Sequence, residues 1–520
     1  MRVTAAHQIS NIIATPLFMK QLSLALLPAS LFVLALAMAR ATAFDADPDY
    51  TYLLNGLNLF TVHAPWDIGH PGTTLHWLAG AVIGVTWLCR WPFVMDWPVD
   101  DVLRHPEFYL LAIHTVIAAL VAAAVFCCGS MIDRAAGLPS ALAAQAVWLV
   151  SFPTIASLPR VTPEPMIIAI AAALIGVFAP HVLDPKQPER PVAAGILFGA
   201  GLALKITTVP WVLLLLLFDD RRTRKIALVT AALAALAITL PIASRYRLML
   251  AWWESLAVHR GIYGEGEVGL PTTAQFGTSL LDLLGTNPEY SVALIASLGL
   301  AIFQARSRSI FLICAAVIAV QLVVVAKHPN ERYLLQHPND RYLLPAMVAV
   351  VLATAAAVAF GHRVSASTVA AAVIAVGIWH AANFALPWFR ARVESRKDNA
   401  ALLDQMASSG CLLAVYYENN ASQEFKLAFG DMFAGFLYAS ELSKLYPNFL
   451  HYDFGLQRFQ TFGRTLEPGE ADHRLAAAPC VNFAGSPLER LKGASSSAWL
   501  LIARTNYDQK NSLAVYRRYR

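Results

Sequence analysis

Charged side chains are scarce in this sequence. Lys, Arg, Asp and Glu together make up 14% of its 520 residues, whereas hydrophobic residues make up 57% and the mean hydropathy is +0.53. An ordinary soluble domain carries about 25% charged residues, so this balance excludes a soluble globular protein. A chain of this length and composition has room for many apolar spans of about 20 residues each. The sequence therefore predicts a polytopic α-helical membrane protein.

Neither sign of charge dominates, and cysteine is rare. The net charge of +5 is spread over many loops rather than gathered in one basic stripe, which argues against nucleic-acid binding. The six cysteines show no zinc-binding spacing. Cys411 and Cys480 lie in the polar C-terminal segment. They can form a disulfide if this segment lies outside the membrane, although nothing in the sequence brings them together.

The first apolar run, about Leu22 to Phe44, is expected to be a retained membrane anchor. It is long for the apolar part of a signal peptide, and it follows Lys20, which favours a cytoplasmic N-terminus. Its small-residue end, Ala39 to Ala43, leaves a cleaved signal peptide as the alternative.

Basic loops set the expected topology, because short cytoplasmic loops carry the excess of Lys and Arg. All such loops fall inside only if the early segment Thr74 to Met95 lies along the outer interface instead of crossing. This arrangement gives eleven crossings, with twelve as the alternative. The basic loops are those at Lys186 and Arg190, at Arg221 to Lys225, and at Arg306 and Arg308.

Two domains are expected. Residues 1–387 form a transmembrane catalytic domain whose first outer loop covers 44–107, and residues 388–520 form a small α/β domain outside the membrane. The C-terminal segment mixes short apolar runs, such as Cys411 to Tyr417 and Ala498 to Ala503, with polar turns. That pattern is typical of strands between helices.

An acidic motif follows the first apolar run. Asp45, Asp47 and Asp49 stand close together, with no Lys or Arg between them and the later Gly-His70-Pro-Gly element. The predicted topology puts other unusual polar residues on the same face, which suggests a reaction site at the outer leaflet. These residues are Arg160, Glu164, Lys205, Trp252, Trp253 and a His-Pro-Asn repeat.

The repeat consists of nine residues in tandem, Lys327 to Leu335 and Gln336 to Leu344. Each copy holds His-Pro-Asn and then Arg-Tyr-Leu-Leu. A nine-residue step is about two and a half helical turns, so the copies would face opposite sides of a helix. We therefore expect one copy to act and the other to be a spacer.

Together these motifs resemble the GT-C glycosyltransferases that use polyprenyl-phosphate sugars, among them protein O-mannosyltransferases and lipid A aminoarabinose transferases. Those enzymes have an acidic motif after the first span, then His-Pro or Lys-Pro-Pro, a glycine-leucine-lysine stretch, and Arg-Tyr-Leu-Leu-Pro. The matching stretches here are Asp47 to Tyr50, His70-Pro71, Gly201 to Lys205, and Arg341 to Pro345. The likeness covers about the first 390 residues. Asp-Pro-Asp and His-Pro-Gly depart from the Asp-Glu and Lys-Pro-Pro of relatives.

The resemblance implies an integral-membrane glycosyltransferase that acts at the outer face of the membrane on a lipid, glycan or protein acceptor. The alanine-rich spans and the absence of eukaryotic sorting signals favour a bacterial inner membrane. Sugar transfer from a lipid phosphate needs a base for the acceptor hydroxyl and cations for the departing phosphate. Asp47 or Asp49, with Asp45 beside them, is the expected base. The expected phosphate ligands are Arg341, Lys205, His70, Arg160 and Arg332, and the further candidates are Glu164, His337 and Tyr342.

Several alternatives stay open at this stage. Asp47 and Asp49 can instead bind a divalent metal ion, so a metal cofactor and none are both compatible with the sequence. The acidic motif can be an ordinary solvated loop, and Lys205 can extend to the interface. A transporter or flippase of lipid-linked glycans is the alternative function, although the charges stand at segment ends rather than mid-span and no inverted repeat is evident. A polymerase or ligase of lipid-linked glycans would share the donor chemistry.

Overall fold

The computed structural model describes most of the chain, and contacts divide it into two compact units, each described here by itself. Unit 1 comprises Met1–Met38, Ile68–Leu75 and His114–Pro387, and unit 2 comprises Ala39–Asp67, His76–Ile113 and Trp388–Arg520. The described residues are 16–42, 44–258, 271–304, 307–327, 339–361, 363–411, 413–417, 422–453, 458–485, 499–506 and 512–518. Arg306, Arg332, His337 and the first copy of the tandem repeat after Lys327 lie outside them.

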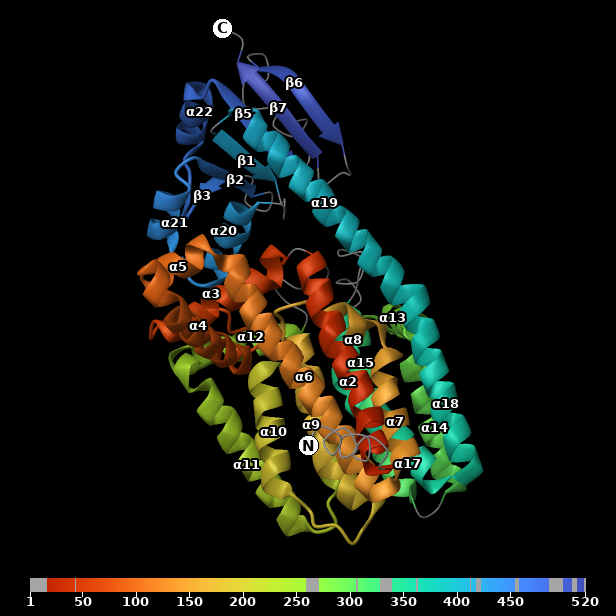
Figure 1. Cartoon of the computed structure of the whole chain (residues 1–520). Coiled ribbons are helices and arrows are strands. Elements are labelled where there is room, and N and C mark those ends of the chain that lie inside the picture. The colour runs from red at the N-terminus through yellow and green to blue at the C-terminus, as the bar shows by residue number, and fades with distance from the viewer. Residues whose placement is uncertain are drawn as a thin grey trace, which may run out of the picture. The chain divides into compact units, whose positions relative to one another are not determined.

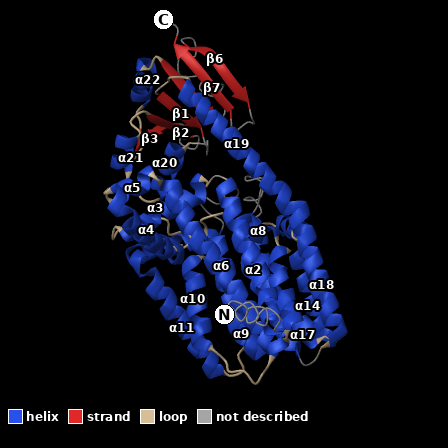
Figure 2. Ribbon diagram, viewed as in Figure 1, coloured by secondary structure: helices blue, strands red, loops and turns tan. Residues whose placement is uncertain are grey.

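All regular secondary structure in the described part of unit 1 is helical; helices are drawn in blue in Figure 2. Four helices, α2 (Pro16–Ala41), α4 (Thr73–Val94), α6 (Pro106–Ala136) and α19 (Leu386–Ser408), are divided between the two units. The other helices of unit 1 are α7 (Leu138–Ala146), η2 (Val147–Leu149), α8 (Phe152–Ser157), α9 (Pro163–Leu183), α10 (Pro191–Leu204), η3 (Ile206–Leu217), α11 (Arg221–Thr239), η4 (Leu240–Arg245), α12 (Tyr246–Val258), α13 (Thr273–Thr286), α14 (Pro288–Phe303), α15 (Arg308–Ala326), η6 (Asn339–Ala346), α17 (Met347–Phe360), α18 (Arg363–His380) and η7 (Ala381–Ala385).

Eight helical segments of the described residues are long and apolar enough to cross a membrane. Four shorter apolar helices accompany them: Leu138–Leu149, Pro191–Leu204, Ile206–Leu217 and Pro288–Phe303. The predicted helical membrane fold is thus confirmed, whereas the eleven crossings stay a prediction. The segment expected along the outer interface forms α4, and its length and composition also suit a crossing. The eight segments are Phe18–Ala41, Thr73–Val94, Pro106–Ala136, Pro163–Leu183, Arg221–Ser255, Arg308–Ala326, Arg341–Phe360 and Ser367–Ser408.

Helices α10 and α11 form a tightly packed hairpin, which lies beside α9 in Figure 1. Gly195 and Gly199 make the close approach between them. A Cβ atom at Gly195 would lie 2.5 Å from the carbonyl oxygen of Ala227, and one at Gly199 would lie 2.5 Å from that of Ala231. Small residues let helix backbones meet in this way where no hydrophobic effect drives the contact.

Unit 2 joins the predicted first outer loop to the C-terminal segment. Helix α3 (Thr51–Phe60) packs on α20 (Gln423–Phe433), and asparagine side chains hold the contact. Asn55 and Asn58 donate to the carbonyl oxygens of Phe433 and Ala434, each at 3.0 Å. The Tyr438 hydroxyl donates to Asn58 Oδ1 at 2.7 Å. Further helices of this unit are η1 (Ala46–Tyr50), α5 (Pro98–Arg104), α21 (Ala439–Leu445) and α22 (Pro468–Ala477), together with most of α19.

The C-terminal segment carries a seven-stranded mixed sheet in the order β4-β3-β2-β1-β5-β7-β6. Strand β1 pairs in parallel with β2 and β5, and the remaining pairs are antiparallel. Val415, Leu450 and Val481 are fully buried at its centre. The predicted small α/β domain is therefore present. The strands are β1 (Leu413–Tyr417), β2 (Phe449–Asp453), β3 (Arg458–Thr461), β4 (Arg464–Thr465), β5 (Cys480–Gly485), β6 (Trp499–Asn506) and β7 (Ser512–Arg518).

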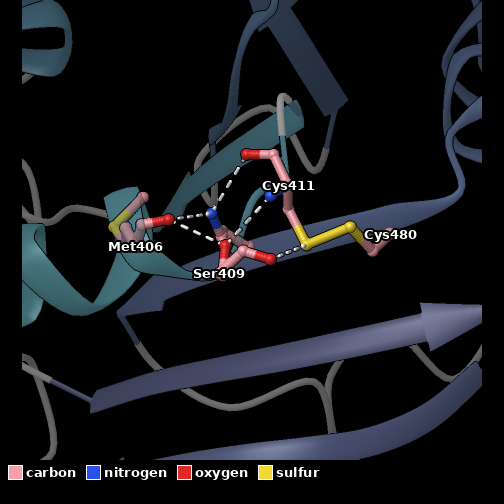
Figure 3. The surroundings of a disulfide bond; sticks show 5 residues. Met406, Ser409, Cys411 and Cys480 are labelled. Atoms are coloured by element: carbon pink, nitrogen blue, oxygen red, sulfur yellow. Dashed lines mark hydrogen bonds between the residues drawn. A yellow bond between two sulfur atoms is a disulfide. The ribbon is translucent and has the colours of Figure 1, made fainter.

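A disulfide joins Cys411 to Cys480 at the start of two adjacent strands, β1 and β5 (Figure 3). Their Cα atoms are 5.4 Å apart. Ser409 lies beside the bridge, accepting a hydrogen bond from the Cys411 N–H at 3.1 Å and bonding to Asn482 Oδ1 at 3.0 Å. The sequence left this pairing open, because only the parallel strand pair brings the two residues together.

The domain division at residue 387 stays a prediction, since it is a statement about independent folding. The contacts of the described residues add one fact that the sequence did not suggest. Much of the predicted first outer loop, residues 44–67 and 76–107, groups with the C-terminal segment rather than with the remaining helices.

Candidate active site

A buried ion pair is the centre of the site in unit 1. Glu164 stands in the first turn of α9, and Lys205 follows the last residue of α10 in an extended conformation. Lys205 Nζ lies 2.5 Å from Glu164 Oε1, and each side chain is 3% exposed. Buried charges persist only when they are paired and hydrogen-bonded. Lys205 therefore faces inward, and the alternative of a lysine extended to the interface is wrong.

Arg341 and Tyr342 of η6 complete the charged side of the site. Arg341 Nε lies 3.9 Å from Glu164 Oε1, and its side chain is 43% exposed. The Tyr342 ring centroid is 4.3 Å from Lys205 Nζ and 5.3 Å from Arg341 Cζ, within the range of cation–π contacts. Two cations share one carboxylate here, so these side chains together carry a net positive charge.

His70 lies against the same aromatic ring. Its imidazole centroid is 5.9 Å from that of Tyr342 and 4.9 Å from that of Trp252, which it meets edge-on. Burial, and then the nearby Lys205, hold the pKa of His70 well below its usual range, with Glu164 opposing. This shift favours the neutral form of the imidazole. Its buried Nδ1 has no hydrogen-bond partner among the described residues.

Backbone contacts fix His70 beside Lys205. The Gly72 N–H donates to the carbonyl oxygen of Leu204 at 3.1 Å, and Gly72 adopts a φ of +63°, which favours glycine. The hydroxyls of Thr73 and Thr74 donate to carbonyl oxygens in the last turns of α10, at 3.1 and 2.8 Å. On the other side, Trp253 Nε1 donates to the Gly69 carbonyl at 3.1 Å. The Gly-His-Pro-Gly element is thus a connection docked onto the end of α10.

Helix η6 is held by two buried polar side chains. Gln321 of α15 donates to the Tyr342 carbonyl at 2.5 Å, and Trp211 of η3 donates to the Pro345 carbonyl at 2.7 Å. Gly201 lets the Trp211 ring approach, since a Cβ there would lie 2.5 Å from it. The motifs Gly201 to Lys205 and Arg341 to Pro345 therefore meet in space. Lys205, Glu164, Arg341, Tyr342 and His70 together form the Lys205 cluster.

The acidic turn of unit 2 gives its three carboxylates different surroundings. Asp49 is fully buried, and its Oδ2 accepts a hydrogen bond from the Asp45 N–H at 2.8 Å. Asp45 forms an ion pair with Arg392 at 2.9 Å. Asp47 is exposed and extended, with φ −112° and ψ 123°, and precedes a cis peptide bond to Pro48. Asp47 alone of these three has an exposed side chain.

Three further predicted residues, Arg160, Arg332 and His337, are not part of the Lys205 cluster. Arg160 is half-buried in the turn between α8 and α9, where its N–H donates to the Ser157 carbonyl at 3.1 Å. Arg332 and His337 lie outside the described residues. Sequence reasoning missed that Glu164 is the partner of Lys205 and that Arg392 is the partner of Asp45. The first pair did leave a signal in the sequence, because each of its residues is a charged residue at the end of an apolar run. Such a residue needs an opposite charge once it is buried.

Comparisons with known proteins bear on the fold. No protein-family model matches the chain, and no curated protein matches it. Two crystal structures of ArnT from Cupriavidus metallidurans do match, one in the apo state with a TM-score of 0.57 and one bound to undecaprenyl phosphate with a TM-score of 0.54. In each, 12% of residues are identical, and the match covers 94% of this chain and 97% of the ArnT chain. ArnT is a GT-C glycosyltransferase, so the predicted GT-C fold is confirmed.

Proposed function

We propose that this protein transfers a sugar from a polyprenyl-phosphate-linked donor to a lipid, glycan or protein acceptor. The single observation that carries the proposal is the Lys205 cluster, a net-cationic site assembled from three motifs at helix ends. The fold supports it, because one of the matching structures is ArnT bound to undecaprenyl phosphate. Cations bind phosphate and apolar helices contact lipid chains, so this combination suits a phosphate on an isoprenoid lipid.

Lys205 and Arg341 are proposed to bind the donor phosphate. The Lys205 ammonium is compact and held by Glu164 at 2.5 Å, whereas the Arg341 guanidinium is 43% exposed and can grip two phosphate oxygens at once. Negative charge grows on the phosphate as the sugar leaves, and fixed cations stabilise that charge in the transition state. The neutral His70 is proposed to hydrogen-bond the phosphate through Nδ1, and Tyr342 to keep both cations in place.

Asp47 is proposed as the base that takes the proton of the acceptor hydroxyl. Its exposed carboxylate can meet an incoming substrate, whereas Asp49 is buried and bonded within its own turn, and Asp45 is paired with Arg392. Asp45 and Asp49 then have the role of shaping the turn. Metal binding by Asp47 and Asp49 stays a separate prediction.

The reaction is proposed to take place at the outer face of the bacterial inner membrane, with the N-terminus in the cytoplasm. The disulfide between Cys411 and Cys480 supports an extracytoplasmic C-terminal domain, because disulfides persist in oxidising compartments and are rare in the cytosol.

The test is transfer of radiolabelled sugar from a panel of polyprenyl-phosphate sugars to membrane acceptors by reconstituted protein. We expect Asp47→Asn and Arg341→Ala to lower transfer at least 100-fold at equal expression. The matched controls are Asp404→Asn on α19 and Arg222→Ala on α11, both of which change exposed side chains. They should transfer like the wild type.

The same preparation distinguishes sugar transfer from the alternative function, which is lipid flipping. A flippase would move the labelled lipid across liposomes without joining the sugar to an acceptor, and Asp47→Asn would not have a selective effect. If the wild type flips but does not transfer over the full donor panel, the glycosyltransferase proposal is wrong.

A further inference from the structure

A second cluster of ionisable side chains lies in unit 1, apart from the Lys205 cluster. It consists of His181 in the last turn of α9, Glu189 in the α9–α10 connection, and Asp219 in the connection from η3 to α11. One ligand atom from each lies within 4.8 Å of the others. Three separate segments of chain thus bring metal-ligating groups to one place.

Distances within the cluster suit a bound cation. His181 Nε2 lies 3.4 Å from Glu189 Oε1 and 3.4 Å from Asp219 Oδ2. Zinc binds nitrogen and oxygen ligands at about 2.1 Å, and two tetrahedral ligands at that distance are about 3.4 Å apart. A direct bond between an imidazolium and a carboxylate would be shorter, at about 2.7–2.9 Å.

The tautomer of His181 points the same way. Its Nδ1 lies 3.1 Å from the Gln187 carbonyl oxygen, which can only accept, so Nδ1 carries the hydrogen. Nε2 then faces two carboxylate oxygens. A metal ion bound at Nε2 would supply the positive charge that both carboxylates attract. A histidine whose other nitrogen donates to a carbonyl is the arrangement that metal-binding histidines adopt.

We propose that His181, Glu189 and Asp219 bind one divalent transition-metal ion of the zinc class. Imidazole together with carboxylates suits Zn²⁺ better than the all-oxygen sites that Mg²⁺ prefers. Glu189 is held in place by the Asp219 N–H, which donates to Glu189 Oε1 at 2.7 Å. The Asp219 side chain is 81% exposed, so it can adjust its distance and leave a coordination position to water.

The ion has a structural role in this proposal. Glu164 and His181 are 17 residues apart on α9, which at 1.5 Å per residue separates them by about 26 Å. The metal site therefore stands at the far end of α9 from the Lys205 cluster. The ion links the end of α9 to the α9–α10 connection and to the connection from η3 to α11. Both connections are partly exposed.

The experiment uses the full chain in detergent, purified without a histidine tag and stripped with a chelator. Zn²⁺ is added, metal per chain is measured by mass spectrometry, and affinity by competition with a chromophoric chelator. We expect one Zn²⁺ per chain in the wild type. His181→Ala and the isosteric Glu189→Gln should each weaken binding at least tenfold. His473→Ala, which removes an exposed histidine elsewhere, should bind like the wild type.

The proposal is overturned if the wild type retains no Zn²⁺, or if the wild type and both cluster variants retain the same amount. Preference for Mg²⁺ over Zn²⁺ would also overturn it. If His181→Ala does not fold, Glu189→Gln decides alone. Because the readout is metal content, failure here leaves the proposed sugar transfer untouched, and failure of sugar transfer leaves this site untouched.

Discussion

Glu164 and Lys205, 41 residues apart in the chain, form an ion pair of 2.5 Å from which water is almost wholly excluded. Each is the only strongly charged residue at the end of its helix, and neither could be buried without the other. Arg341 adds a second positive charge beside this pair. The three side chains can therefore bind an anion while Glu164 and Lys205 stay in contact.

Breaking this pair should destabilise the protein. Glu164→Gln leaves the buried Lys205 without its carboxylate, and Lys205→Met leaves Glu164 with only the more distant Arg341; breaking a buried pair in this way costs about 3–5 kcal/mol. Thermal unfolding in detergent should show a clear loss for each single variant. The double variant should recover much of that stability, since two neutral side chains need no counter-charge, but it should not recover sugar transfer. Lys186→Met, at an exposed loop position, is the control. Equal stability of all variants would contradict the pairing.

The two acidic candidates should fail in different ways. Asp47→Ala removes an exposed carboxylate and should abolish transfer while lowering the melting temperature less than Asp49→Ala does. Asp49→Ala removes the acceptor of the Asp45 N–H and should lower stability by about 1–3 kcal/mol. Activity and melting temperature are measured on the same preparations. Normal folding of Asp49→Ala with loss of transfer would instead make Asp49 the base.

Asp431 should make stability depend on pH. Burial raises the pKa of this carboxyl from 3.8 to about 7, with Glu441 adding to the rise and the Tyr438 N–H opposing it. Between these values the native state holds a proton that the unfolded state has released, so stability falls as pH rises from about 4 to 7 and is level above. Asp431→Asn keeps a neutral group that can accept the Tyr438 N–H.

At pH 8 the free energy of unfolding of Asp431→Asn should exceed that of the wild type by roughly 2–4 kcal/mol, and its melting temperature should be higher. The difference should shrink toward pH 5. Melting temperatures at pH 5, 6, 7 and 8 measure this. Glu424→Gln, a neighbouring exchange at the start of α20, should not change the profile. A constant difference at all four pH values would show that Asp431 does not hold the proton.

The disulfide should stabilise the C-terminal domain. It closes a loop with a sequence separation of 69, for which chain entropy alone predicts about 4 kcal/mol. Cys411→Ser with Cys480→Ser should therefore lower the melting temperature, and intact mass without reductant should show two fewer hydrogens in the wild type. Cys89→Ser, at an unpaired exposed cysteine, is the control. Unchanged melting together with free thiols in the wild type would contradict the pairing.

Much of the fold could be predicted, because composition and apolar run length decide the membrane class directly. The motif order Asp47, His70, Lys205 and Arg341 also predicted the GT-C fold. The apolar run Cys411 to Tyr417 became a strand as its pattern indicated. These features depend on short stretches of sequence, where periodicity and composition are sufficient.

Pairings between distant residues could not be predicted. Glu164 was one of several candidates until α9 and α10 placed it against Lys205, and Asp45 has its partner, Arg392, 347 residues away. The roles of Asp47 and Asp49 differ only through burial, which two identical side chains two residues apart do not reveal. The number of crossings stays a prediction, since α4 suits both an interfacial and a spanning helix.

The hydrogen bonds from Gly72, Thr73 and Thr74 to the end of α10 make the imidazole of His70 and the ammonium of Lys205 parts of one rigid corner. Ordering such a corner costs conformational entropy when the chain folds, not when a ligand arrives. A phosphate would therefore meet groups that are already in position. Loosening that corner, for example with Thr74→Ala, should weaken donor binding even though Thr74 carries no charge and belongs to no recognised motif.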